Sequence, residues 1–460
     1  MIDKSTIAQF GESLQGRVLQ PLDAGYDEAR AIWNGMFDRR PAMIARCRGA
    51  ADVVASVRFA REHDLRVAIK SGGHGVAGTS VGEAGLTIDL APMRSVRVDA
   101  HRRVAWVDAG ATWQDVDHET QSVGLATTGG VDSRTGVGGL TLGGGLGYLA
   151  RTHGLTIDNL ISAEVVTAGG ERLHTSESAH ADLFWALRGG GGNFGIVTSF
   201  EFRLHPVGPE VMTAQTFHPV RDAREVLHFY RELMRDAPDE LACYAMCVRV
   251  PPVAPFPEAF HGQTAIVLVA CYSGALKAGR AALTPLHRFG NPIVNMLQPM
   301  PYMILQRSFD DGTPKGGRYY WKAHYLEGLS DDVVETLVDQ VDAFPGPLSI
   351  VGIEPMRGAI ARVDAAATAF AHRSAGFSFG LWAGWTDPAA DEQMIARTRT
   401  FYEAMAPHAT GGVYANYLDA DDQEKVRSAY GGNYERLRKV KAVYDPQNFF
   451  RANQNIEPAD

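Results

Sequence analysis

The stretch KSGGHGVAGTS, residues 70–80, gives the first indication of the fold, because it sets one histidine inside a glycine-rich loop after a short apolar run. Glycine allows positive φ and lets the backbone approach a ligand closely. Two interpretations of His74 stay open on this stretch alone: it tops a tight turn, or it acts on a large ligand for which the glycines make room. Further glycine-rich stretches follow at 129–147 and 188–195. We therefore expect the first half of the chain to surround a ligand.

The composition narrows the classes of protein to which the chain can belong. Its 460 residues are too many for one hydrophobic core and predict at least two domains. Hydrophobic residues make up 45% and charged residues 21%, which is ordinary for a globular protein. The net charge of −9, without a block of Lys and Arg, excludes nucleic acid and anionic membrane as expected partners. The partner that remains is a small molecule.

Cysteine usage and the lack of long apolar runs predict a cytoplasmic protein. The four cysteines are too few for a disulfide framework, and we expect buried free thiols and no metal site at Cys47, Cys243, Cys247 and Cys271. No apolar run approaches the roughly 20 residues of a membrane span. The polar start of the chain lacks the apolar core of a signal peptide.

Residue patterning predicts an α+β first half, up to residue 207. Apolar runs and alternating segments indicate strands, and the Gly169–Gly170 pair suits a hairpin turn. The predicted strands and hairpins lie at 42–46, 67–69, 86–90, 96–113, 160–176 and 193–206, with helices from Asp52, at 113–123 and at 181–189.

From residue 208 the pattern changes to long strands with helices between them. Strands are predicted at 211–219, 240–250, 264–274 and 376–385, and helices at 221–236, 331–344 and 391–405. This alternation predicts an antiparallel sheet with helices on one face. The aromatic residues that could line a pocket gather here: Tyr319, Tyr320, Trp321, Phe377, Phe379, Trp382 and Trp385. The chain ends in a helix stopped by Asp445–Pro446 and a short extended tail.

Two interpretations of the glycines at 136–147 compete. Gly145, Gly147 and Ala150 match G-x-G-x-x-A, with Glu164 about twenty residues on, as in an NAD-dependent Rossmann dehydrogenase. The chain before Gly145 is itself glycine-rich, however, and not a buried strand. We favour two separate glycine loops that present backbone N–H groups to the diphosphate of one extended cofactor.

Several motifs together resemble a known family. SGGHG at 71–75, GVGGLTLGGG at 136–145 and RGGGGNFGIVT at 188–198 resemble the PCMH-type FAD-binding half of the vanillyl-alcohol-oxidase superfamily. YANYLD at 414–419 and the tail at 433–456 resemble the berberine-bridge-enzyme-like subgroup. The resemblance implies a two-part FAD-binding domain at 1–207 (core about 37–207), a substrate-binding domain at 208–410, and a C-terminal segment at 411–460 that returns to the FAD-binding domain.

The resemblance also implies roles for single residues. His74 matches the histidine that the family bonds covalently to the flavin. Asp132 stands where many members carry a cysteine that makes a second bond, so we expect one covalent link only. Thr135 stands where an apolar residue often controls oxygen access, which leaves oxidase or dehydrogenase behaviour open. The residues expected to contact FAD are Ser71, Gly72, Gly73, Gly75, Gly78, Gly136, Gly138, Gly139, Gly144, Gly145, Gly195, Val197, Asn416 and Asn455, with Asn453 beside them.

The implied activity is oxidation of an alcohol or amine carbon in a sugar, alkaloid or other natural product, with hydride passing to FAD and O2 reduced to hydrogen peroxide. The family base is often the tyrosine of the NY pair, here Tyr417, with Tyr414 as helper. A working phenolate needs a nearby cation, and Arg373 or Lys322 could supply it. Glu354 is a weaker acid–base candidate. The alternatives are the NAD-dependent dehydrogenase and a flavin-binding module without turnover.

Overall fold

The computed structural model describes residues 2–344 and 346–460, and it begins with a small mixed sheet. Its strand order is β1-β2-β4-β3, in which β2, β4 and β3 run parallel and β1 pairs antiparallel at the edge. The strands are β1 (Arg17–Leu19), β2 (Met43–Arg46), β3 (Val67–Lys70) and β4 (Leu86–Asp89), with helices α1 (Lys4–Glu12), α2 (Tyr26–Arg30) and α3 (Ala50–Glu62). Because β3 ends at Lys70, the loop at 71–80 leaves directly from the end of a buried parallel strand.

A five-stranded antiparallel sheet follows, in the order β5-β6-β10-β8-β9. The two predicted hairpins are confirmed, since β5 pairs with β6 and β8 with β9. Its strands are β5 (Val96–Asp99), β6 (Val104–Asp108), β8 (Leu160–Val166), β9 (Arg172–Ser176) and β10 (Ile196–Arg203), accompanied by α4 (Trp113–Gln121), α5 (Val137–Leu142), α6 (Ala150–His153) and α7 (Ala181–Leu187). The chain before Gly145 forms the short α5 and not a buried parallel strand, so the Rossmann interpretation is wrong.

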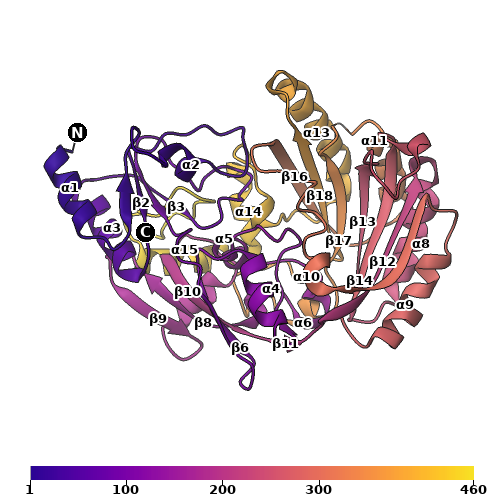
Figure 1. The fold of residues 1–460 in the computed structure, drawn as a ribbon, viewed down its shortest axis with the longest axis horizontal. Helices are drawn as coiled ribbons and strands as arrows, with labels where there is room; N and C mark the ends of the chain where they lie inside the picture. Colours follow the sequence, from indigo (N-terminus) through magenta and orange to yellow (C-terminus); the bar gives the residue numbers. More distant parts are fainter. Residues whose placement is uncertain (1, 345) are drawn as a thin grey trace.

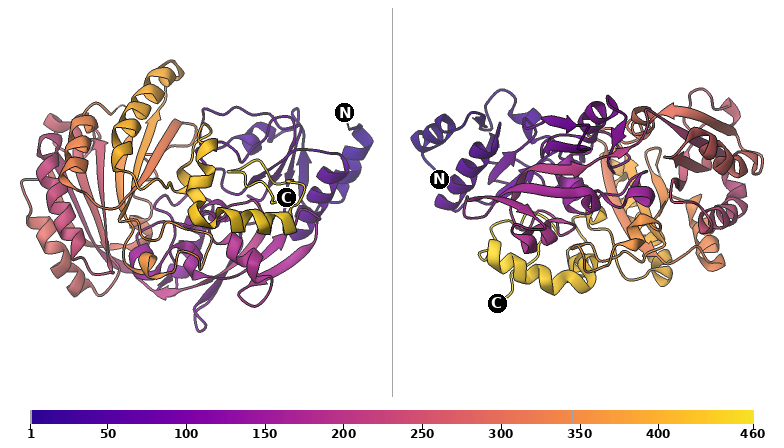
Figure 2. Two further views of the ribbon diagram at one scale, coloured as in Figure 1. Left: turned by 180° about the vertical axis from the view of Figure 1, so that it is seen from behind. Right: turned by 90° about the horizontal axis from the view of Figure 1, so that it is seen from below.

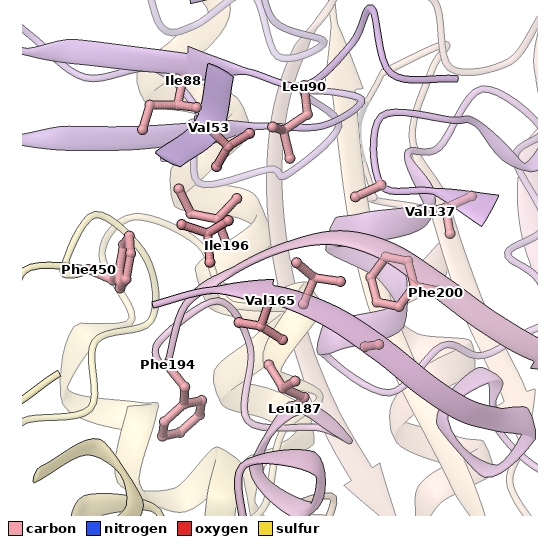
Figure 3. Close-up of a cluster of buried hydrophobic side chains, with 14 of the residues drawn as sticks. Val53, Ile88, Leu90, Val137, Val165, Leu187, Phe194, Ile196, Phe200 and Phe450 are labelled. Atoms are coloured by element: carbon pink, nitrogen blue, oxygen red, sulfur yellow. The ribbon is translucent and has the colours of Figure 1, made fainter. Parts of the chain in front are cut away.

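The core of the first half lies between these two sheets. Ile88 of β4 and Leu90, just after that strand, face Val165, Ile196 and Phe200 from the second sheet (Figure 3). These apolar side chains are almost fully buried, and burial of this kind stabilises the domain by about 25 cal/mol per Å² of apolar surface.

The C-terminal segment packs back on the first half, as both views in Figure 2 show in yellow. Its helices are α14 (Val426–Tyr430) and α15 (Tyr434–Tyr444). Leu437 of α15, with Phe450 and Ile456 of the tail, belongs to the same buried core as α7 and β10. This arrangement brings the tail beside the glycine loop at 188–195.

The middle of the chain forms a seven-stranded antiparallel sheet in the order β15-β12-β14-β13-β17-β18-β16 (Figure 1). Its strands are β12 (Glu210–Pro219), β13 (Leu241–Arg249), β14 (Thr264–Tyr272), β15 (Val294–Pro301), β16 (Arg318–Leu326), β17 (Ile350–Pro355) and β18 (Phe377–Trp385). The four predicted strands are confirmed, whereas β15, β16 and β17 were not predicted. β15 is an edge strand with polar and proline residues, and β17 is short, so neither carries a clear alternating pattern.

Helices cover one face of this sheet, as predicted. They are α8 (Ala223–Arg235), α9 (Leu276–Arg288), α11 (Asp331–Val341) and α13 (Asp391–Met405), and their apolar sides share one core with the sheet. Part of the other face packs against Tyr148 and Leu149 of the first half. Shorter elements are β7 (Leu125–Ala126), β11 (His205–Pro206), α10 (Tyr302–Leu305) and α12 (Ala359–Arg362). Among the described helices, none has the length and apolar character that crossing a bilayer requires.

Candidate active site

A cavity of about 350 Å³ lies where the glycine loops, the face of the large sheet opposite its helices and the C-terminal tail meet. Most residues predicted to touch a cofactor line it: Ser71, Gly72, Gly73, His74, Gly75, Gly136, Gly138, Gly139, Gly195, Val197, Asn416 and Asn453. Asp132, Thr135, Tyr414, Tyr417 and Glu354 line it too. Residues from all three predicted segments of the chain therefore meet in one place.

The glycine loops form a cradle because they lack side chains. A Cβ on Gly72 would stand 2.6 Å from the backbone nitrogen of Gly136, so the first two loops can touch only as glycines. A Cβ on Gly75, Gly139 or Gly192 would meet nothing within 4 Å, although these residues line the cavity. The backbone is thus left uncovered toward the cavity, as close approach to a diphosphate requires.

His74 stands in this cradle, and a stack of rings links it to the second half of the molecule. It stacks on Trp33 at 4.5 Å between ring centroids, and Trp33 stacks in turn on Tyr319 of β16 at 3.7 Å. Nε2 of His74 is buried and has no hydrogen-bond partner. It lies 3.6 Å from Oδ2 of Asp132, the residue expected in place of a second linking cysteine. Packing on Trp33 therefore orients the imidazole, and its Nε2 faces the Asp132 carboxylate without a hydrogen bond to the protein.

The Asp132 carboxylate is held as an anion beside His74. Oδ2 of Asp132 accepts hydrogen bonds from Nη2 of Arg134 and from Oγ1 of Thr313, both at 2.7 Å. Burial by itself raises the pKa of Asp132, but the contacts with His74 and Arg134 outweigh burial and lower it well below its usual range. Asp132 therefore stays ionised, as one member of an ion pair with Arg134 at this edge of the cavity.

Tyr417 and Glu354 form a second polar group on the cavity wall. Oη of Tyr417 lies 3.1 Å from both carboxylate oxygens of Glu354. Burial raises the pKa of Glu354 to about 7. Burial, followed by the nearby charge of Glu354, raises the pKa of Tyr417 well above its usual value. Tyr417 is therefore a neutral phenol that donates to Glu354, and Glu354 is the group that titrates near neutrality.

The cations expected beside Tyr417 are engaged elsewhere. Arg373 makes a bidentate ion pair with Asp158 at 2.7 and 2.8 Å, and Lys322 pairs with Asp422 at 2.8 Å. The partner of Tyr417 is the carboxylate of Glu354 and not a cation. The burial of the Glu354 carboxylate depends on the fold and has no signal in the local sequence.

Tyr414 organises the residues around it. Its hydroxyl accepts hydrogen bonds from the backbone N–H of Gly145 and from Nδ2 of Asn416, both at 2.8 Å. Its ring meets that of Tyr417 edge to face at 4.8 Å between centroids. Tyr414 thereby ties the C-terminal segment to the second glycine loop.

Some expected contacts fall outside the cavity lining: Gly78, Gly144, Gly145 and Asn455. At each of these three glycines a side chain would collide with the surrounding protein. A Cβ on Gly78 would stand 2.4 Å from the ring of Phe37, one on Gly144 would stand 2.9 Å from Phe370, and one on Gly145 would stand 2.0 Å from Thr156. Gly191, Gly192 and Gln454 line the cavity without having been singled out, as does Trp33, which no motif contains.

The aromatic residues of the middle region divide by strand alternation. Tyr319, Trp321 and Trp382 line the cavity. Tyr320, Phe377, Phe379 and Trp385 lie in the core on the helix-covered face. Successive side chains of a strand point to opposite faces of the sheet, so neighbours such as Tyr319 and Tyr320 have different roles.

Comparison with known proteins agrees with this geometry. Residues 41–176 match the family described as FAD binding domain, and residues 413–457 match the family described as berberine and berberine like. An FAD-linked oxidoreductase of Dictyostelium discoideum is 31% identical over 98% of this chain and 97% of the relative. The (R)-6-hydroxynicotine oxidase of Paenarthrobacter nicotinovorans is 29% identical over 97% of both chains.

A solved structure shares the whole fold. The crystal structure of 6-hydroxy-D-nicotine oxidase from Arthrobacter nicotinovorans superposes with a TM-score of 0.87 at 26% identity, covering 97% of this chain and 99% of that one. The FAD-binding match covers the first two glycine loops of the cradle, and the berberine-like match covers Tyr414, Asn416 and Tyr417. This chain belongs to the berberine-bridge-enzyme-like FAD-linked oxidoreductases.

Proposed function

We propose that this enzyme oxidises an alcohol or amine carbon of a small molecule with FAD bonded covalently to His74 alone, and passes the electrons to O2 to give hydrogen peroxide. One observation carries the proposal: the imidazole in the glycine cradle and the Tyr417–Glu354 pair line the same cavity. A cofactor attached at His74 and a substrate beside Glu354 would therefore share one cavity.

The residues of the cradle suit FAD. The uncovered backbone around Gly75 and Gly139 would hold the diphosphate, and Asn416 would lie near the flavin ring. FAD, when bound, supplies a two-electron acceptor for the hydride that leaves the substrate. Asp132 stands at the position of the second covalent link and does not form it, because a carboxylate lacks the nucleophilicity of a thiolate.

The protein's own task is to remove the substrate proton. We assign the base to Glu354 and the transfer to Tyr417: the substrate O–H or N–H donates to Oη of Tyr417 while Tyr417 gives its own proton to Glu354. The 3.1 Å distances support this relay. A base with a pKa of about 7 is ionised in a large fraction of molecules at neutral pH, which is what general-base catalysis requires. Tyr414 and Asn416 position Tyr417.

The proposal is tested by the colour and redox behaviour of the purified protein. We expect a yellow protein whose flavin stays with the polypeptide after acid precipitation, and whose absorbance bleaches when an alcohol or amine substrate is added without oxygen. Admission of air should restore the colour and release hydrogen peroxide. A flavin that leaves entirely on precipitation would refute the covalent link. A reduced flavin that persists in air would refute O2 as the acceptor.

A flavin-binding module without turnover is the second candidate. The buried Tyr417–Glu354 pair favours an enzyme. Burial of the ionisable Glu354 lowers the stability of the fold, and a protein that only carries flavin would gain nothing from it. Failure of a broad panel of alcohols, amines and sugars to bleach the flavin would favour the module. We also propose a cytoplasmic location, supported by the free state of all four cysteines.

A further inference from the structure

One indole ring lies flat on the floor of the cavity, and its position is built into the sheet. Gly352 of β17 pairs with Gly380 of β18 in the ladder. A Cβ on Gly352 would stand 2.3 Å from one edge of the Trp382 ring, and a Cβ on Gly380 would stand 2.5 Å from the other edge. The ring therefore spans both glycines, which leave the space that any larger residue would fill. We call this ring, with the two glycines beneath it, the indole shelf.

Other rings stand at steep angles around the indole shelf. Trp321 lies opposite Trp382 in the ladder, with centroids 6.2 Å apart. Tyr417 meets the Trp382 ring edge to face at 5.6 Å and the Trp321 ring at 5.7 Å. Glu354 follows Gly352 by two residues on the same face of β17, so the acid lies at one end of the shelf. The indole shelf is therefore bordered by rings that stand at steep angles, with the proposed base at its end.

The walls around the indole shelf are largely apolar, and the polar groups that they add are few and set at ring edges, such as the unpartnered indole N–H groups of Trp321 and Trp382. Among the residues that the structure describes, the side chains that the middle region adds to the lining are chiefly apolar: Tyr244, Met246, Phe309, Leu348, Ile350 and Trp321. The hydroxyl of Tyr319 donates to the carbonyl of Pro314, and that of Thr313 donates to Asp132. A sugar needs several polar partners for its hydroxyl groups, whereas an aromatic ring needs flat apolar contact.

We propose that the substrate of this enzyme carries a planar aromatic ring that stacks on Trp382, with its oxidisable alcohol or amine carbon attached beside the ring. This inference rests on the proposed function and names its substrate class. The reacting carbon gives up a hydride to the flavin, and its O–H or N–H proton passes through Tyr417 to Glu354. The product is the corresponding aromatic carbonyl or imine, and O2 takes up the two electrons.

The test is binding of a matched pair of unreactive probes to the holoenzyme. Benzamide is planar and aromatic, whereas cyclohexanecarboxamide has the same amide on a puckered ring, and neither carries an alcohol or amine carbon to oxidise. Binding is followed by the change in the visible spectrum of the flavin. We expect benzamide to bind at least about 10-fold more tightly, from stacking and better apolar contact. Equal affinities, or glucose or xylobiose binding as tightly as benzamide, would overturn the proposal.

Substitutions at the indole shelf test whether Trp382 causes the preference for benzamide. Trp382→Leu should reduce the preference for benzamide to less than about 2-fold, because the flat contact surface is gone. Trp106→Leu is the matched control: Trp106 lies on β6, stacked under Arg97 at 4.1 Å, and outside the cavity lining, so the preference should stay. Gly380→Ala provides a second variant, since its methyl must displace the indole and weaken benzamide binding. A preference unchanged in either shelf variant would refute the role of Trp382.

Failure of this inference can be told apart from failure of the proposed function. A yellow holoenzyme that is bleached by sugars but not by benzylic alcohols or amines would leave the FAD-dependent oxidation standing and overturn the aromatic substrate alone. A protein without flavin would remove the proposed function itself.

Discussion

At the scale of single residues, two carboxylates in one cavity have opposite properties. Asp132 is surrounded by Arg134, Thr313 and His74, and these contacts keep it ionised. Glu354 receives a hydrogen bond from Tyr417 and has a pKa raised by burial to about 7. The first carboxylate is a fixed charge beside the proposed attachment point, and the second is a proton acceptor that titrates.

Glu354→Gln should abolish the pH dependence of flavin reduction. The base works when ionised, so the anaerobic reduction rate of the wild type should rise as pH increases through about 7. The variant should be slower by about 100-fold or more and flat across this range, and Tyr417→Phe should show a similar loss. Stopped-flow reduction between pH 5.5 and 8.5 measures both. A wild-type rate that falls with pH through this window would contradict Glu354 as the base.

His74→Ala should release the flavin on denaturation, because the covalent bond is lost while the glycine cradle remains. Asp132→Asn should lower the fraction of protein that carries linked flavin, since the charge that faces Nε2 of His74 disappears. The mass of the denatured polypeptide reports the linked fraction without reference to activity. Asp310→Asn is a control, because Asp310 bonds to Ser133 nearby and does not face His74. Linked flavin in the His74 variant would place the bond elsewhere.

At the scale of elements, the C-terminal helix is fastened to the third glycine loop by a buried charge. Nζ of Lys441 on α15 bonds to Asp445 at 2.7 Å, to the carbonyl of Asn193 at 2.7 Å and to that of Phe450 at 2.9 Å. Asp445 also accepts from the backbone N–H of Phe450 at 2.8 Å. One ion pair thus holds the helix, the tail and the loop at 188–195 together.

Lys441→Met should destabilise the protein by about 3–5 kcal/mol, because it leaves Asp445 buried without its counter-ion. Lys439→Met on the same helix replaces an exposed lysine and should cost less than about 1 kcal/mol. Urea unfolding measures the difference, and flavin retention in the two variants reports whether the loop has moved. Equal effects of the two substitutions would contradict this account of the tail.

At the scale of the whole molecule, the cavity exists because the two halves are joined across it. Asn34 of the first half is fully buried, and its Nδ2 donates to the carbonyls of Val76 and of Tyr319 on β16, both at 2.8 Å. Its Oδ1 accepts from the backbone N–H of Tyr319 at 3.1 Å. The same strand carries the ring that stacks on Trp33, so the position of β16 and the orientation of His74 are coupled.

Asn34→Ala should cost about 3 kcal/mol, since buried backbone groups on both halves lose their partners. The flavin should also become exposed to solvent at a lower temperature than in the wild type. Its fluorescence on heating should therefore rise earlier. Asn295→Ala is the matched control: Asn295 is exposed and bonds to His287 within the middle region. A flavin signal shifted equally by both substitutions would argue against a special role for the junction.

Many secondary-structure elements of this protein can be predicted from short stretches of its sequence. The glycine loops, the hairpins at 96–113 and 160–176, the α+β class and the four long strands of the middle region were predicted because each depends on turn chemistry or on alternation within a few residues. The position of His74 in a cradle of glycines follows from the same kind of signal, and the family matches confirm the resemblance.

The tertiary structure alone decided which residues face one another. Burial gives Glu354 its raised pKa, strand register sets Trp382 over Gly352 and Gly380, and packing separates Gly145 from the cavity while Gly192 stays open to it. Glu354 and Tyr417 are 63 positions apart, so no short stretch of sequence indicates that they form a hydrogen bond. A pKa, a stacking surface and an ion pair are properties of surroundings assembled from distant parts of the chain, and so they appear only when the chain is folded.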